Sequence, residues 1–107
     1  MNVKQILDSI RSNEIEVDEQ FGLLDDETLY KYRLIKQILG EYERLDGFSN
    51  NRYRVLNLFY FKQLSVSTIQ KKLGYKDERS IYRLKEQGIE ELEKRFSRKA
   101  YPPRSGS

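Results

Sequence analysis

Arginine, glutamine, serine and tyrosine side chains recur at helical spacing near the C-terminal end of the sequence. Counted at 100° per residue, Arg79 and Arg83 share one face of a helix predicted over residues 78–96, with polar side chains on its flanks. Arginine can bind guanine through two hydrogen bonds, glutamine can do so with adenine, and serine and tyrosine commonly contact phosphate. The sequence therefore predicts that the first two turns of this helix read DNA bases. The candidate base-reading residues are Arg79, Ser80, Tyr82, Arg83 and Gln87.

Small polar and basic side chains come just before this helix, on a shorter predicted helix and the turn that follows it. Such side chains contact the phosphate backbone of DNA when the neighbouring helix enters a groove. The candidate phosphate contacts are Ser67, Thr68, Lys71, Lys72 and Lys76. The alternative is that these charges are only solvated, and that the two arginines form ion pairs one turn away with Glu86 or Glu90.

Capping residues predict that the candidate site lies on a helix-turn-helix. Ser65 is suited to cap a short helix over residues 66–73, and Gly74 can end that helix in the left-handed conformation. Asp77 can then cap the longer helix, in which Gly88 lies on the core face and predicts close packing against another helix. A short helix, a turn with glycine and a longer helix with a basic start is the geometry that brings the second helix into the major groove.

Apolar periodicity predicts three further helices, so the expected fold class is all-α with about five helices. The first helix covers residues 2–13, the second runs from Asp25 or Asp26 to residues 46–47, and the third begins after Asn50 or Asn51 and runs to residue 61. Residues 14–25 have no clear period, which predicts an extended connection. The apolar stripe of the second helix comprises Leu29, Tyr32, Ile35, Leu39 and Tyr42, with Ile38 and Leu45 beside it. The tyrosines at 30, 32, 42, 53 and 60 are expected at the edge of the core rather than stacked on bases.

The predicted organisation has three parts. Residues 1–49 form an N-terminal helical arm that covers the rest or makes an oligomer, residues 50–97 form the helix-turn-helix domain, and residues 98–107 form a basic tail. Pro102-Pro103 cannot continue a helix, so the tail is expected to be disordered. Its last four residues are typical of a cloning remnant.

Composition restricts the chemistry that the chain can perform. None of the 107 residues is His or Cys, which excludes zinc sites, thiol nucleophiles, disulfides and imidazole catalysis. A nuclease could use Asp25, Asp26 and Glu27 around a divalent metal, but no fold signal supports it, so no enzyme activity, metal or cofactor is expected. No apolar run approaches the roughly 18–20 residues that span a bilayer, and no signal peptide follows Met1, so we expect a cytoplasmic protein.

The net charge of +3 conceals a division between two halves. Residues 1–47 carry 6 basic and 11 acidic side chains, whereas residues 48–107 carry 14 basic and 6 acidic ones. Such asymmetry indicates a half that binds a polyanion. The acidic half is predicted to restrain loose DNA binding or to present an acidic face to a partner.

Three segments of the second half together resemble a known family. They are 55–65 (VLNLFYFKQLS), 69–75 (IQKKLGY) and 79–84 (RSIYRL). Their pattern is similar to the C-terminal DNA-binding region of bacterial sigma factors, and more closely to small phage-encoded late-gene activators of the ArpU and RinA type. The resemblance covers about residues 52–96. It implies a transcription regulator of a bacterial host that reads promoter DNA with the helix over 78–96 and has RNA polymerase as a potential partner.

The chain departs from the family pattern at three places. Gln70 stands where a small residue is expected, and the turn after Gly74 is one residue longer. Phe59 stands where the family usually has a charged residue. An aromatic side chain there is expected to be covered by the N-terminal helices or by a second subunit.

Two other functions fit the same sequence. One is a small terminase-like DNA packaging subunit, whose helix-turn-helix binds a packaging site while its other helices form a ring. The other is a helix-turn-helix module that binds RNA polymerase or another regulator and has lost DNA binding. A homodimer or higher oligomer is predicted to be possible through residues 26–46 and Phe59. A large ring would support the packaging subunit, whereas a monomer or dimer would oppose it.

Overall fold

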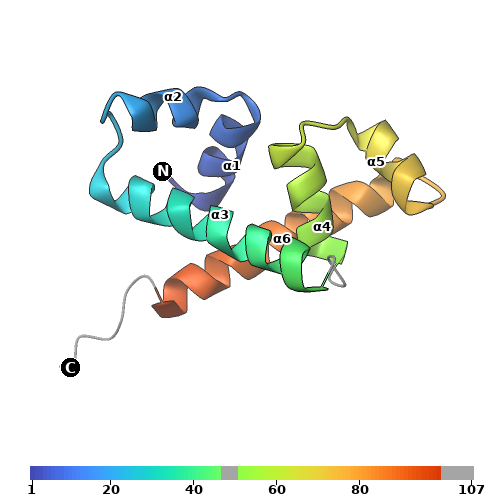
Figure 1. The fold of residues 1–107 in the computed structure, drawn as a ribbon. Helices are drawn as coiled ribbons and strands as arrows, with labels where there is room; N and C mark the ends of the chain where they lie inside the picture. Colours follow the sequence, from blue (N-terminus) through green and yellow to red (C-terminus); the bar gives the residue numbers. More distant parts are fainter. Residues whose placement is uncertain (47–50, 100–107) are drawn as a thin grey trace.

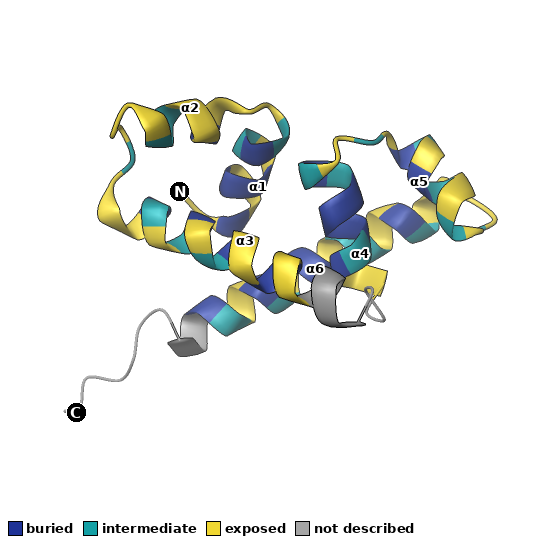
Figure 2. Cartoon of the chain, in the orientation of Figure 1, coloured by how far each residue is buried: buried dark blue, intermediate teal, exposed yellow. Residues whose placement is uncertain are grey.

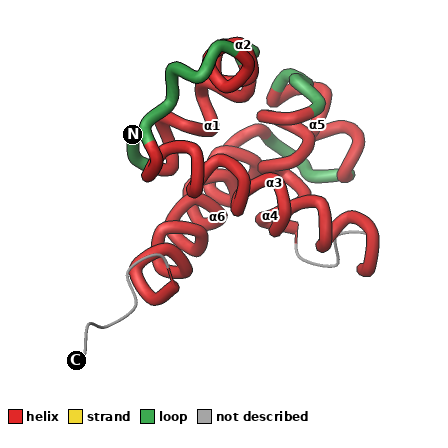
Figure 3. Tube along the Cα trace, turned by 60° about the vertical axis from the view of Figure 1, so that its left-hand side comes forward, coloured by secondary structure: helices red, strands yellow, loops and turns green. Residues whose placement is uncertain are grey.

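The computed structural model describes residues 1–46 and 51–99, which form an all-α fold (Figure 1). The predicted fold class is confirmed, because these residues form six α-helices and one π-helical segment and contain no strand. α6 (Glu78–Lys99) extends from the side of α5 (Val66–Leu73) past α4 (Asn51–Leu56) toward the C-terminus (Figure 1 and Figure 3). Gly47 and the part of the predicted tail from residue 100 onward lie outside the described residues.

The first helix, α1 (Val3–Arg11), begins at a reciprocal cap. The Asn2 side chain accepts a hydrogen bond from the backbone N–H of Gln5 at 2.8 Å, and the Gln5 side chain accepts one from the backbone N–H of Asn2 at 2.9 Å. This arrangement satisfies two backbone donors that a helix start otherwise leaves free. One face of α1 is buried, and it comprises Val3, Ile6, Leu7 and Ile10.

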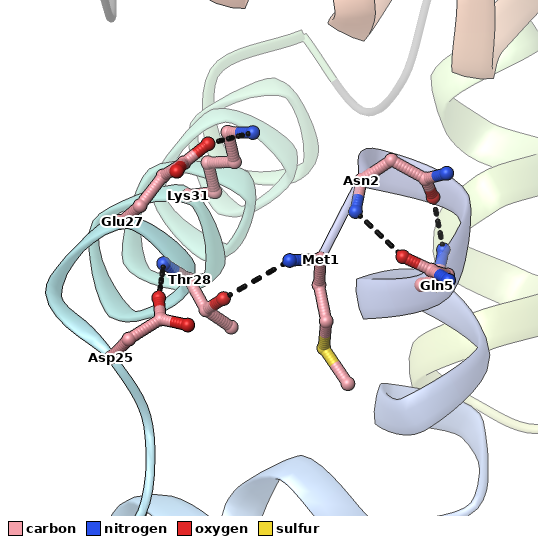
Figure 4. A network of polar contacts seen from close by, with 7 residues as sticks. All are labelled: Met1, Asn2, Gln5, Asp25, Glu27, Thr28 and Lys31. Atoms are coloured by element: carbon pink, nitrogen blue, oxygen red, sulfur yellow. Dashed lines mark hydrogen bonds and ion pairs between the residues drawn. The ribbon is translucent and has the colours of Figure 1, made fainter.

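The long helix α3 (Asp26–Asp46) begins beside the start of α1, as Figure 4 shows. Asp25 caps it, as predicted, by accepting a hydrogen bond from the backbone N–H of Thr28 at 2.7 Å. Hydrogen bonds from the backbone and the side chain of Thr28 lower the pKa of Asp25. The Thr28 hydroxyl also accepts a hydrogen bond from the amino group of Met1 at 3.4 Å, so one residue joins the two helix starts.

Most of the predicted stripe of α3 faces the core. Tyr32, Ile35, Ile38 and Leu39 are buried, and Leu29 is half-buried. The predicted stripe residues Tyr42 and Leu45 lie among the side chains that are not described.

The expectation of an extended connection over residues 14–25 is wrong, because Glu14–Gln20 form the helix α2. Asn13 adopts a left-handed conformation with φ 67°, which turns the chain after α1. Glu14 and Glu16 then lie in the first turn, where carboxylates interact favourably with the positive end of the helix. Only Ile15 is buried on this seven-residue helix, so the sequence carries no apolar stripe that could reveal it.

The predicted third helix consists of α4 (Asn51–Leu56) and a π-helical continuation, η1 (Asn57–Phe61). The end of η1 is tied to α1 by the Arg11 guanidinium, which donates to the backbone oxygens of Phe59 and Leu64. The Gln63 side chain donates in return to the backbone oxygen of Arg11 at 2.8 Å. The N-terminal helices are thereby joined to the second half of the chain by polar bonds.

The last two helices, α5 (Val66–Leu73) and α6 (Glu78–Lys99), begin at the predicted caps. The Ser65 hydroxyl accepts a hydrogen bond from the backbone N–H of Thr68 at 3.2 Å, and Gly74 ends α5 with φ 79°. α6 extends beyond Phe96, its predicted last residue, to Lys99.

Two adjoining apolar cores hold the helices together. The larger core joins α1 and α3 to α4, η1 and α6, and the smaller core joins α4 and η1 to α5 and α6. Figure 2 shows the buried residues on the inner sides of α1, α4 and α6, while much of α2 and α5 is exposed. Tyr32, Tyr53 and Tyr60 are buried in the larger core, so they are not available to stack on bases, in line with the prediction. Tyr30, in contrast, is exposed.

α4 and α6 approach each other closely at Gly88, as predicted. A Cβ atom at Gly88 would lie 2.9 Å from Leu56 Cδ1, 3.0 Å from Leu56 Cγ and 3.2 Å from the backbone oxygen of Arg52. This contact fixes how α6 crosses α4. It therefore determines where the first turns of α6 point.

Candidate nucleic-acid interface

The turn between α5 and α6 is closed by the side chain of Gln70, one of the positions at which the sequence departs from the pattern that it resembles. Gln70 donates through Nε2 to the backbone oxygen of Tyr75 at 2.7 Å, and its own backbone oxygen accepts from the backbone N–H of Tyr75 at 3.1 Å. The Tyr75 hydroxyl accepts a hydrogen bond from Asn51 at 2.9 Å, which ties the turn to the start of α4. Gln70 and Tyr75 therefore stabilise the longer turn, a role that sequence reasoning did not assign to them.

The first turn of α6 is held by one cap and one apolar anchor. Asp77 accepts a hydrogen bond from the backbone N–H of Ser80 at 3.3 Å. Ile81 is fully buried against Val55, Val66 and Ile69. With Ile81 in the core, the opposite side of the first two turns faces solvent.

The predicted base-reading residues lie on this exposed side of α6. Arg79, Tyr82, Arg83 and Gln87 are exposed, while Ser80 is half-buried. The side chain of Arg79 is 88% exposed and pairs with Asp77 at 3.5 Å, a distance at the outer end of the range for ion pairs. Such exposed pairs contribute little stability, so this contact leaves the guanidinium accessible.

The alternative prediction, in which acidic residues of α6 form ion pairs with its two arginines, differs from the structure. Within residues 1–46 and 51–99, Arg83 forms no ion pair, and neither arginine pairs with Glu86 or Glu90. The side chains of Arg79, Arg83, Glu86 and Glu90 are exposed on the same helix and are accessible to solvent or a ligand. The carboxylates of Glu86 and Glu90 would repel phosphate, which favours contact with the first two turns and disfavours contact with Gln87, which lies in the third turn.

The predicted phosphate contacts flank the start of α6. Thr68, Lys71, Lys72 and Lys76 are exposed, and Ser67 is half-buried. The Thr68 hydroxyl accepts a hydrogen bond from the Ser65 hydroxyl at 2.9 Å. Across the described part of the chain, the three lysines take part in no ion pair, so their charges are available for an external anion.

Phe59 is covered within the chain, by the N-terminal helix as predicted and also by α6. The Arg11 guanidinium lies 4.0 Å from the ring centroid, and the Lys85 ammonium lies 4.2 Å from it. Contacts of this kind are favourable because the face of the ring carries partial negative charge. Phe59 is half-buried between the two cations.

Lys85 extends this cluster of cations and rings toward the exposed side of α6. Its ammonium lies 5.2 Å from the ring centroid of Tyr82, and burial lowers its pKa, as does the nearby positive charge of Lys4. Sequence reasoning did not select Lys85 or Arg11. A signal existed for Lys85, because it follows the buried Ile81 by four residues and so lies on the core side of α6.

No family model, curated protein or solved structure matches this chain. Across the described residues, no group of three or more acidic side chains is placed to bind a metal ion. No helix in residues 1–46 or 51–99 has the length and apolarity to cross a bilayer.

Proposed function

We propose that this protein is a sequence-specific regulator of transcription that binds double-stranded DNA, of the type of the phage late-gene activators. It reads the major groove with the first two turns of α6, carries out no catalysis and uses no cofactor. The observation that carries the proposal is the exposed pair Arg79 and Arg83 on one face at the start of α6. Neither arginine is neutralised by the later acidic residues of its own helix.

The geometry supports the proposal because each part has the size that groove binding needs. A major groove about 12 Å wide admits one α-helix, and the helix enters with its N-terminal residues. α5 is brief, with eight residues, and presents exposed Lys71 and Lys72 beside that start. The lysines supply affinity for the phosphates of any sequence, and the arginines supply preference for guanine.

The first experiment is to select bound duplexes from a random pool and then to measure affinity for the selected site. Arg83→Ala is expected to cost about 1–3 kcal/mol on the selected site and to relax the preference at one base pair. Lys72→Ala is expected to weaken binding to all duplexes alike. It should also reduce the slope of log affinity against log salt concentration by about one, because one phosphate contact is lost. Lys94→Ala is the matched control, because Lys94 is an exposed lysine on α6 far from its first two turns.

The outcome that opposes the proposal is unchanged binding by the double variant Arg79→Ala, Arg83→Ala. If no duplex shows salt-dependent binding, the chain is instead a protein-binding helix-turn-helix module. The mass in solution is measured on the same sample. An enriched palindrome with a dimeric mass supports a regulator, whereas a large ring supports a packaging subunit.

A further inference from the structure

Three apolar side chains are exposed together where α2 ends, at the opposite end of the molecule from the candidate DNA site. Phe21 is 72% exposed, Leu23 is 70% exposed and Val17 is 48% exposed. Isolated exposed apolar residues are ordinary, but a cluster of large ones is typical of an interaction site. We call Val17, Phe21 and Leu23 the α2 corner.

The backbone holds the α2 corner in one arrangement. Gly22, with φ 68°, ends α2, and its N–H donates to the backbone oxygen of Glu19 at 3.1 Å. The N–H of Leu23 donates to the backbone oxygen of Asp18 at 2.8 Å, and the N–H of Phe21 donates to that of Val17 at 3.1 Å. This paired closure of a helix end folds Leu23 back beside Val17, while Phe21 follows Val17 by one turn. This spacing places the three side chains on one side of the helix end.

Acidic residues flank the α2 corner along the chain. Between Arg11 and Lys31 the chain contains seven acidic residues and no basic one. The acidic residues are Glu14, Glu16, Asp18, Glu19, Asp25, Asp26 and Glu27. Three of them are engaged at α3: Glu19 pairs with Arg33 at 3.4 Å, Glu27 pairs with Lys31 at 2.8 Å, and Asp25 accepts the capping hydrogen bond from the backbone N–H of Thr28 at 2.7 Å.

We infer that the α2 corner docks a basic amphipathic helix of a different protein. The apolar stripe of such a helix would cover Val17, Phe21 and Leu23, and its flanking lysines or arginines would meet the carboxylates around them. The argument for this occupant is charge complementarity. A symmetric contact between two copies of the α2 corner would instead bring two sets of these carboxylates together, which is unfavourable.

The docking surface is compatible with simultaneous DNA binding but does not depend on it. In Figure 1, α2 and α5 lie at opposite ends of the molecule, with α1 and α4 between them. A molecule that contacts phosphates through α5 and α6 would keep the acidic α2 corner away from the duplex. The inference therefore goes beyond the proposed function and assigns the N-terminal helices a partner of their own.

The test uses the full chain and a labelled synthetic peptide of 18 residues. The peptide forms a helix with a leucine stripe flanked by lysines, and the control peptide carries glutamate in place of every lysine. Binding is measured by fluorescence anisotropy at low and at physiological salt. We expect the lysine peptide to bind, the glutamate peptide not to bind, and the affinity to fall as salt rises.

The variant Phe21→Ala, Leu23→Ala is expected to bind the lysine peptide at least tenfold more weakly and to bind duplex DNA like the wild type. Both side chains are exposed, so the circular dichroism of the variant should match that of the wild type. The matched control is Tyr82→Ala, which removes an exposed aromatic ring on α6 and is expected to retain peptide binding.

Equal binding of both peptides, or unchanged binding by the Phe21→Ala, Leu23→Ala variant, would overturn the inference. So would a concentration-dependent doubling of mass that this variant abolishes, because a second copy would then cover the α2 corner. Failure of the chain to bind DNA opposes the proposed function and leaves the peptide result intact.

Discussion

Tyr60 places its hydroxyl inside the larger core, where no group among the described residues forms a hydrogen bond with it. A buried polar group without a partner costs about 1–3 kcal/mol, because the hydrogen bonds to water are lost and not replaced. Burial raises the pKa of this phenol to about 12, and the negative charge of nearby Asp8 raises it as well. The ring of Tyr60 therefore stabilises the folded protein, whereas its unpartnered hydroxyl destabilises it.

We expect Tyr60→Phe to leave the free energy of unfolding unchanged or to raise it by up to about 1.5 kcal/mol. The substitution keeps the ring and removes only the oxygen that has no partner. Urea denaturation followed by circular dichroism measures the change, with Tyr30→Phe as the control because the side chain of Tyr30 is exposed. A loss of more than about 1 kcal/mol would mean that the hydroxyl is hydrogen-bonded in solution.

The same group predicts the behaviour of the protein in alkali. The phenol releases its proton near pH 10 in the unfolded chain and near pH 12 in the folded protein. Between these values the folded state binds more protons, so its stability falls as pH rises, by up to about 1.4 kcal/mol per pH unit. Denaturation at pH 9, 10.5 and 11.5 should show this fall, and Tyr60→Phe should reduce its slope. An identical slope in the variant would assign the alkaline transition to other groups.

At the scale of helices, the crossing of α4 and α6 depends on the absence of a side chain at Gly88. Leu56 is fully buried at this crossing, so it has little freedom to move away from an added methyl group. Gly40 in α3 is the natural comparison, because a Cβ atom there would have no neighbour within 4 Å. Both glycines lie inside helices, and they differ in what surrounds them.

We expect Gly88→Ala to lower the free energy of unfolding by about 1 kcal/mol, since overpacking outweighs the gain in helix propensity. Gly40→Ala should raise it by about 0.5–1 kcal/mol, because only the propensity changes. Thermal and urea denaturation of both variants measures the two effects. Similar stabilisation by both substitutions would show that α4 and α6 are less closely packed than in the structure.

Local chemistry explains why much of the second half could be predicted from the sequence. The caps at Ser65 and Asp77 and the left-handed Gly74 depend on neighbours within a few residues, so their types reveal them. The sequence did not predict α2, because this helix has a single buried residue and begins after Asn13, which adopts a left-handed conformation.

Contacts between distant residues explain what could not be predicted. Arg11, Phe59 and Lys85 meet only after α1, η1 and α6 have packed together. The part of the candidate site that sequence reasoning found, the face with Arg79 and Arg83, needs only helical periodicity and one buried neighbour, Ile81.

At the scale of the whole molecule, one core spans both halves of the chain. Val3, Ile6 and Leu7 of the N-terminal helices share it with Tyr53 and Leu56 of the second half. The acidic helix α2 and the basic helix α5 are nevertheless apart, because they lie at opposite ends of a body that measures 48 × 33 × 25 Å. The carboxylates of α2 can therefore act on bound DNA only through long-range electrostatic repulsion.

Measurements of DNA affinity at two salt concentrations can test this long-range repulsion. Screening acts over about 30 Å at 10 mM salt and about 8 Å at 150 mM. The triple variant Glu14→Gln, Glu16→Gln, Asp18→Asn should raise the affinity for any duplex by about three- to tenfold at 10 mM salt, and by almost nothing at 150 mM. The comparison variant Glu86→Gln, Glu90→Gln removes carboxylates on α6 itself, so its gain in affinity should persist at 150 mM. An equal gain for both variants at 150 mM would place α2 beside the duplex and contradict binding through the start of α6.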